Sequence, residues 1–325
     1  MKKRVLELDP RAYRRHAIHQ EGRIWGETNC YTDVWIELLH ALGYDPVASL
    51  PFTFAIDFEG DQWTFFKCPL RDLYDLYRLD VQELAIWRPL AAHIEEQVER
   101  GRPVLVELDS YFLPDTAGTA YRRMHWKSTA AVVEIDVSRR FMGYFHNQGY
   151  YHLEGDDFLD ALRLRTAQDA VNLAPYVEFV KIHPGADARP VLPRSLALFR
   201  EHLSAVPVAN PFPRFKARLD KDLDHLISGG LDAFHQYSFA TVRQFGACFE
   251  LAQTYLEWLA AHGEAALDGE IRAFGEIAEG AKAFQFHLAR AMSRGKPPDL
   301  SPLEAMGERW QRAIHRLRAR YAASA

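Results

Sequence analysis

The sequence changes character once along its length, and this change limits the folds open to it. Up to about residue 183, short apolar runs typical of strands alternate with helical patterns, whereas from about residue 190 the pattern is helical almost throughout. The change falls in a segment with several Pro and Gly residues, HPGADARPVLPRS (183–195), which we interpret as a linker. A chain of 325 residues is long enough for two domains. We therefore predict an α+β domain over residues 1–185 and a helical bundle over residues 190–325.

The first part predicts helices packed on an antiparallel sheet. Residues 30–42 carry a helical stripe of apolar side chains that ends at Gly43, and residues 90–100 form a second helical pattern. Strand patterns occur at 103–113, 127–137, 139–147, 149–154 and 176–183. Because the three middle strand patterns are joined by short connections, we expect them to be antiparallel neighbours.

The second part predicts four or five long amphipathic helices. Helical patterns cover residues 194–204, 212–228, 230–262, 267–294 and 301–321. The expected breaks include Pro207, the pair Gly229–Gly230, and Gly263. Long helices with short connections are typical of a bundle.

The composition excludes several kinds of partner. The formal net charge is −5, which disfavours nucleic acid, and no apolar run approaches the roughly 20 residues of a membrane span. The basic start of the chain has no apolar run after it, so we expect no signal peptide and a cytoplasmic protein. The three cysteines (Cys30, Cys68 and Cys248) form no CxxC pair. We therefore expect no disulfide framework, no metal and no cofactor.

The segment GETNCYTDVW contains the most informative residue, Cys30. Thr28 and Asn29 are good N-cap residues, and the apolar helical stripe begins just after them. Cys30 is therefore expected in the first turn of a helix, where the backbone N–H groups and the helix dipole favour a thiolate. The alternative is that Cys30 is a small buried apolar residue, as most free cysteines are.

His125 strengthens the interpretation of Cys30 as a nucleophile. It lies immediately before the strand pattern at 127–137, from which a histidine can reach a helix N-terminus and act as general base toward a thiol. Asn147, after the next strand pattern, is predicted to orient His125, and His146 precedes it. The order Cys, His, Asn is that of papain-like folds. A surface histidine beside basic neighbours is the alternative for His125.

Three further residues are predicted to bind substrate. Asp109 ends a strand pattern, where a carboxylate can bind a substrate amine or orient a neighbouring base. Glu27 is a second group able to bind an amine, and its charge makes it unsuited to stabilising an oxyanion. Arg243 belongs to a row of polar residues spaced by seven in the helical part, which lines either a pocket or a polar network between helices. Asp115, after Pro114, is as readily explained as a turn residue.

These motifs resemble those of a known family. The run from Asn29 to about Leu162 resembles the N-terminal domain of the butirosin-biosynthesis protein H type, which belongs with papain-like cysteine peptidases and bacteriocin-leader peptidases. The matching features are NCY followed by LLHALG, then VLVELDSYFLPDT, AYRRMHWKST, AVVEIDV and GDDFLDAL. The resemblance implies a papain-like fold and an acyltransferase that moves an acyl or aminoacyl group from a carrier-protein thioester to an amine. The whole chain, including FHQYSFATVRQFG and GAKAFQFHLARA, also resembles an uncharacterised bacterial two-domain family.

Three functions follow as hypotheses. The first is an acyltransferase in which Cys30 attacks a thioester of a carrier protein, with a small-molecule amine as acceptor. The second is a cysteine peptidase or amidase on the same residues, although Ile24 occupies the position where papain-like peptidases usually carry a Gln. The third is a non-catalytic binding protein with an inert Cys30.

Overall fold

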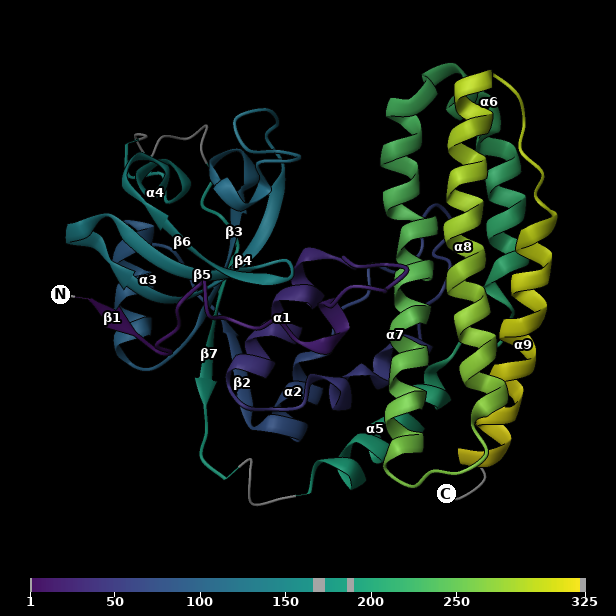
Figure 1. Cartoon of the computed structure of the whole chain (residues 1–325), viewed down its shortest axis with the longest axis horizontal. Coiled ribbons are helices and arrows are strands. Elements are labelled where there is room, and N and C mark those ends of the chain that lie inside the picture. The colour runs from purple at the N-terminus through teal and green to yellow at the C-terminus, as the bar shows by residue number, and fades with distance from the viewer. Residues whose placement is uncertain (1, 166–172, 186–189, 322–325) are drawn as a thin grey trace. The chain divides into compact units, whose positions relative to one another are not determined.

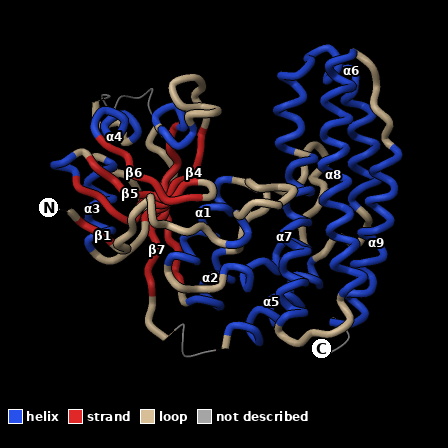
Figure 2. The backbone as a smooth tube through the Cα atoms, viewed as in Figure 1, coloured by secondary structure: helices blue, strands red, loops and turns tan. Residues whose placement is uncertain are grey.

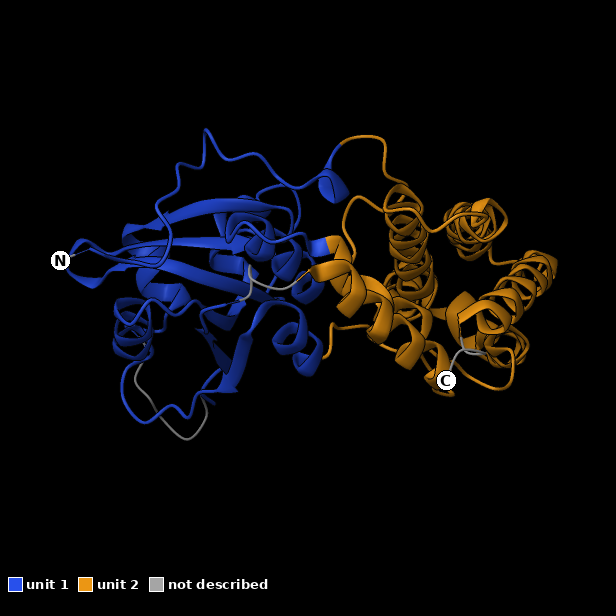
Figure 3. Cartoon of the chain, turned by 90° about the horizontal axis from the view of Figure 1, so that it is seen from below, with its two compact units in different colours: residues 1–20, 29–46, 70–189 blue, residues 21–28, 47–69, 190–325 orange. Residues whose placement is uncertain are grey.

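The computed structural model describes residues 2–165, 173–185 and 190–321, and they divide into two compact units. Unit 1 comprises residues 1–20, 29–46 and 70–189, and unit 2 comprises residues 21–28, 47–69 and 190–325 (Figure 3). Residues 186–189, which fall within the predicted linker, lie outside the described residues. The chain therefore passes from one unit to the other several times before it enters the long helices.

Unit 1 carries the strands and the shorter helices of the chain (Figures 1 and 2). Its helices are α1 (Cys30–Ala41), α2 (Leu70–Tyr77), α3 (Leu90–Glu99) and α4 (Gly155–Ala161). Its strands are β1 (Lys3–Arg4), β2 (Leu79–Glu83), β3 (Val104–Asp109), β4 (Lys127–Asp136), β5 (Phe141–His146), β6 (Gly149–Glu154) and β7 (Val177–Ile182). The two predicted helices and five predicted strands of this part are confirmed, with ends shifted by a few residues.

All pairings among the described strands are antiparallel, and they form one sheet. The strand order is β2–β7–β3–β4–β5–β6, and β1 pairs with the far end of β4. Strands β4, β5 and β6 follow one another as hairpins because their connections are short. The long strand β4 lies in the middle of the sheet and contributes residues to both of its faces.

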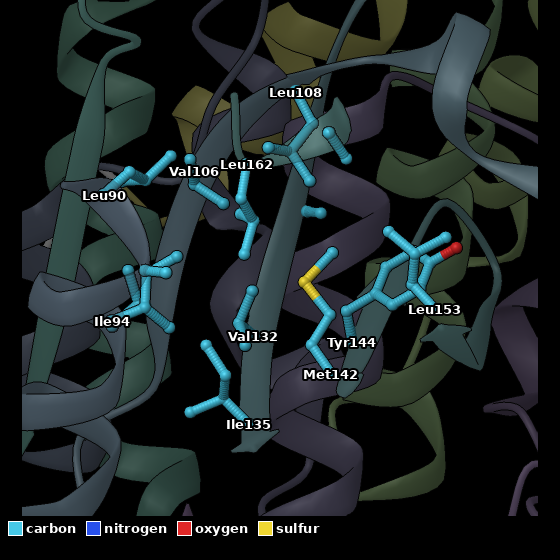
Figure 4. Close-up of a cluster of buried hydrophobic side chains, with 14 of the residues drawn as sticks. Leu90, Ile94, Val106, Leu108, Val132, Ile135, Met142, Tyr144, Leu153 and Leu162 are labelled. Atoms are coloured by element: carbon cyan, nitrogen blue, oxygen red, sulfur yellow. The ribbon is translucent and has the colours of Figure 1, made fainter. Parts of the chain in front are cut away.

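One face of the sheet packs on α3 and α4 through an almost wholly apolar core (Figure 4). Leu90 and Ile94 of α3 contribute to this core, and Val106 and Val132 contribute from neighbouring strands. The alternate residues of the strands point to it, as the period of two requires. Ile94 and Val132 are fully buried.

The opposite face packs on α1, and here polar side chains are buried beside apolar ones. Thr129 of β4 and Glu178 of β7 contact Cys30 and Tyr31, the first two residues of α1. These strand residues alternate with Val132 and Val177, which belong to the apolar core of the other face. The positions of Cys30 and Tyr31 therefore assign α1 to the second face.

Unit 2 is built from long helices that follow one another along the chain. They are α5 (Val191–Ala205), α6 (Pro211–Ala240), α7 (Val242–Ala261), α8 (Asp268–Arg294) and α9 (Ser301–Tyr321). The predicted break at Gly229–Gly230 is confirmed: Gly230 adopts φ +62° and ψ −143°, which are not helical, so α6 consists of two helical segments on either side of a kink. The predicted helix over 230–262 is wrong in its continuity, because a further interruption falls at Thr241. Glycine tolerates the backbone conformation at Gly230, which other residues rarely adopt.

Two short segments from the first part of the sequence complete unit 2. Trp63 packs among phenylalanines of α6 and α7, with ring centroids 5.2 Å from Phe212 and 4.8 Å from Phe245. The indole N–H of Trp25 donates to the carbonyl of Ala278, 3.1 Å away. The short segments thus contribute Trp25 and Trp63 to the core of unit 2, where they pack against residues of the long helices.

The predicted fold class is confirmed: an α+β part with an antiparallel sheet packed against helices precedes an all-helical part, α5 to α9. None of the helices in the described residues is both long enough and apolar enough to cross a membrane.

Candidate active site

Cys30 is the first residue of α1, as the capping residues predicted. The side chain of Asn29 accepts a hydrogen bond of 3.0 Å from the backbone N–H of Thr32, which caps the helix. Cys30 is partly exposed and is a free thiol, whereas Cys68 and Cys248 are buried. Burial raises the pKa of the Cys248 thiol well above its usual range. Cys30 is therefore the cysteine best placed for chemistry.

The side chain next to the thiol is Thr129 of β4. The Cys30 Sγ atom lies 3.8 Å from the Thr129 hydroxyl oxygen, and Thr129 is buried. No hydrogen bond joins Cys30 to His125 in the described residues. Thr129 was not predicted from the sequence, because a threonine within a strand pattern does not indicate a functional role.

His125 is paired with Asp109. The ring Nδ1 of His125 lies 2.6 Å from Asp109 Oδ2, and the backbone N–H of Trp126 donates to Asp109 Oδ1 over 3.3 Å. Tyr111 stacks on the imidazole with ring centroids 4.3 Å apart and an interplanar angle of 13°. The imidazole is 69% exposed. Asp109 thus occupies the position of a group that orients a base, which was one of the two roles predicted for it.

Cys30 and Asp109 belong to the same face of the sheet but to different levels along it. Thr129 pairs with Glu107 across β3 and β4, and Lys127 pairs with Asp109. Two residues of a strand span about 7 Å, so Asp109 lies one such step beyond the level of the thiol. His125 precedes β4 at this outer end.

Asn147 lies in the two-residue turn between β5 and β6. Its φ of +47° falls in the left-handed region, which Asn adopts more readily than most residues, and this gives it a role in the hairpin. In the part of the chain that the structure describes, no hydrogen bond joins Asn147 to His125. The assignment of Asn147 as a catalytic residue stays a prediction.

A buried carboxylate lies beside the start of α1. The hydroxyl groups of Tyr31 and Tyr176 donate to the two oxygens of Glu178, each over 2.9 Å. Burial, followed by the charge of Glu178, raises the pKa of Tyr31 far above its usual range, and burial with the hydrogen bond to Glu178 raises that of Tyr176 to about 12. Both tyrosines therefore remain hydrogen-bond donors at neutral pH.

A second buried charge cluster attaches the N-terminal segment to α1. The imidazole of His19 lies between two carboxylates of α1, with Nδ1 2.5 Å from Glu37 and Nε2 3.1 Å from Asp33. Burial lowers the pKa of His19, but the two carboxylates raise it more, to about 9. His19 is therefore protonated at neutral pH and partly neutralises Asp33 and Glu37.

A Ser–His–Asp arrangement occupies the other face of the sheet. The ring of His146 lies 2.6 Å from the Ser128 hydroxyl and 2.5 Å from Asp115, which also accepts a hydrogen bond from Tyr144. Ser128 and His146 are buried, at 5% and 1% exposure. His146 and Asp115 were recognisable in the sequence, but Ser128 and the contact among the three were not, since they come from separate segments. With so little access, this cluster satisfies buried polar groups and ties the loop at Asp115 to the sheet.

Glu27 and Arg243, both predicted to bind substrate, lie together in unit 2. Their charged groups are 3.6 Å apart, and the Arg243 guanidinium also donates to the backbone carbonyls of Glu27 and Thr28. Arg243 therefore holds the backbone of this segment as well as its side chain.

No group of three or more His, Cys, Asp or Glu residues within the described ranges has the geometry to hold a metal ion. This face of the sheet carries a thiol at a capped helix start, a hydroxyl beside it, and an imidazole–carboxylate pair one strand step away.

The fold and these groups define a class of two-part protein, in which an α+β unit with a cysteine at a helix start is combined with a bundle of long helices. The chain belongs to the DUF1839 family: residues 14–182 match the DUF1839 N-terminal domain, and residues 189–319 match the DUF1839 C-terminal domain. No curated protein matches the chain.

Proposed function

We propose that the protein is a thiol-dependent acyltransferase and that Cys30 is its nucleophile. The observation that carries this proposal is the position of Cys30, a partly exposed free thiol at the capped N-terminus of α1. The first backbone N–H groups of a helix favour a thiolate and also an oxyanion formed next to it.

In this proposal His125 is the base, and Asp109 orients it. The hydrogen bond between Asp109 and Nδ1 leaves the His125 Nε2 atom without a hydrogen-bond partner among the described residues, on an exposed ring. Asp109 contacts the Nδ1 atom of His125, the contact that was expected of Asn147, so we assign the orienting role to Asp109. One strand step separates the level of the pair from that of the thiol, and hydrogen bonds of this kind often form only when substrate is bound.

The reaction proceeds in two steps. First, the Cys30 sulfur forms a bond to the acyl carbon of a thioester while the donor thiol leaves, and His125 carries the proton from Cys30 to that thiol. Second, an amine attacks the acyl-cysteine, His125 accepts the amine proton, and Cys30 regains it as the new amide leaves. The resemblance of the segments around Cys30 and His125 to the butirosin-biosynthesis protein H type supports a thioester donor, such as an acylated carrier protein.

A non-catalytic binding protein is a second candidate, and Thr129 is the observation that favours it. The group that contacts the thiol is a hydroxyl, which is too weak a base to take the thiol proton. Hydrolysis with water as acceptor, as in a cysteine peptidase or amidase, would use the same residues as the transfer reaction.

The test is the intact mass of the protein after incubation with an aminoacyl-pantetheine thioester, with and without an added amine. We expect wild type to gain one aminoacyl group, Cys30→Ala to gain none, and the buried control Cys68→Ala to behave as wild type. His125→Asn should slow acylation by about 10²–10⁴-fold. Amide product favours transfer, and free acid alone favours hydrolysis. The absence of any adduct, with a Cys30 that also fails to react with iodoacetamide, would reject catalysis in favour of the binding protein.

A further inference from the structure

Unit 2 contains a narrow groove between α8 and α9 that is rich in arginine. The two helices are neighbours in the bundle (Figure 1), and the groove has a volume of about 160 Å³. It is smaller than the cavities of about 300–1,000 Å³ that hold drug-sized ligands, so it has room for one small group. The charged residues that line it are Glu270, Arg272, Glu276, Arg309, Arg312 and Arg316.

The charges in the groove do not balance. Four guanidinium groups face two carboxylates, which leaves an excess of two positive charges. Glu276 pairs with Arg309 at 2.6 Å, and the buried Glu270 lies 3.7 Å from Arg316. These contacts hold two guanidinium groups in place and leave most of their N–H donors free.

Arg272 and Arg312 supply the excess charge. Arg272 is exposed and forms no ion pair or hydrogen bond with any described residue. Arg312 has only a 3.6 Å contact with Glu308 on the same helix, and both side chains are mostly exposed, so this pair contributes little. Both arginines are therefore available to a ligand.

The first turn of α8 borders the groove and brings Arg316 close to the backbone. The guanidinium of Arg316 lies over Gly269, where a Cβ atom would be 3.1 Å from its nitrogen. Leu267, the residue before α8, provides no side-chain cap, and the partial positive charge of the helix N-terminus is offset by Asp268 and Glu270 in the first turn. The guanidinium groups and the helix end thus face the same small volume.

We propose that this groove binds a phosphate group. A phosphate carries close to two negative charges at neutral pH and several acceptor oxygens, which match the two excess charges and the forked donors of arginine. A carboxylate has one charge and two oxygens, and would leave part of this charge unbalanced. The groove belongs to unit 2 and Cys30 to unit 1, and phosphate binding does not depend on the function proposed for Cys30.

Calorimetric titration of the full chain at constant ionic strength tests the site, with inorganic phosphate and with phosphoserine as ligands. We expect saturable binding to one site with a Kd at or below about 1 mM. The double variant Arg272→Gln/Arg312→Gln should bind at least about tenfold more weakly, since charge-assisted hydrogen bonds are lost. Neither side chain holds a buried partner, so the variant should fold normally.

The matched control is Arg294→Gln at the opposite end of α8, about 33 Å along the helix from Arg272. Its affinity should stay within about twofold of wild type, because it removes one arginine charge from α8 outside the groove, whereas the double variant removes one groove arginine from each of α8 and α9. Tighter binding of phosphoserine would identify a phosphate ester as the ligand, and equal binding would identify free phosphate. The proposal is overturned if neither ligand saturates the protein, or if Arg294→Gln weakens binding as much as the double variant.

Discussion

The two faces of the sheet in unit 1 are buried by different chemistry. The face under α3 and α4 is filled by aliphatic side chains such as Ile94 and Val132, with the cluster around His146 as its polar exception. The face under α1 buries charged groups, among them Glu37 and Glu178. Apolar burial stabilises through contacts that are not directional, whereas buried charges require partners at hydrogen-bonding distance and orientation. The face that holds Cys30 is thus the more polar of the two. The stability of the protein should depend more strongly on single polar side chains of this face than on single apolar side chains of the other.

The strongest test of this difference is the loss of His19. In His19→Ala, Asp33 and Glu37 lose the cation between them while both remain buried, so we expect a loss of about 4 kcal/mol in the free energy of unfolding. Urea unfolding measures it. His183→Ala is the control, because His183 is partly exposed and lies 3.8 Å from Asp80, a surface pair worth less than about 1 kcal/mol. Equal losses of unfolding free energy in the two variants would show that the buried charges contribute no more to stability than the surface pair does.

The corresponding test on the apolar face is Ile94→Ala. Ile94 is fully buried against the sheet, and its truncation leaves a cavity, so we expect a loss of about 3 kcal/mol. Ile94→Val, measured in the same way, should lose only about 1 kcal/mol. A smooth dependence on the volume removed would support a core held by packing alone. If Ile94→Val destabilises as much as Ile94→Ala, that account of this face is wrong.

The two faces should also differ in how their contribution to the free energy of unfolding changes with pH, although this effect is smaller than those of the substitutions above. The pKa of His19 is raised to about 9 in the folded protein, above the value of about 6.5 for an unperturbed histidine. Its contribution is therefore fully present below about pH 6.5 and is lost as the pH rises through 9. Between these two pH values we expect wild type to lose about 2–3 kcal/mol more than His19→Ala does. Parallel pH profiles for the two proteins would contradict a protonated His19.

The fold class could be predicted because strands and helices have different periods in the sequence. The start of α1 was also predictable, since Asn29 is a strong N-cap residue and the apolar stripe follows it. The ends of helices were less certain: Gly229–Gly230 correctly predicted a break, but the second interruption, at Thr241, has no Gly or Pro beside it to mark it.

The candidate site was predicted as a set of residues but not as a set of contacts. Cys30, His125 and Asp109 were named from their positions at the ends of elements. The pairing of His125 with Asp109, and the contact of Cys30 with Thr129, depend on the register of β3 and β4. A single sequence does not encode this register in any local pattern, so such contacts required the structure.

The membership of residues 21–28 and 47–69 in unit 2 was also not visible in the sequence. The sequence around Trp25 and Trp63 indicates only apolar residues within loops. Nothing near them in the chain identifies their partners. Those partners, which include Phe245 and Ala278, lie about 180 to 250 positions later. Long-range burial of this kind has no periodicity that a sequence pattern would reveal.

The membership of these early segments in unit 2 affects the order in which the protein can fold during its synthesis on the ribosome. At about 5–20 residues per second, the interval between synthesis of Trp63 and of Phe249 is on the order of 10–40 s. Throughout that time the early aromatic segments have left the ribosome without the helices that bury them. Packing of Trp25 and Trp63 is therefore completed only after α7 and α8 have been synthesised.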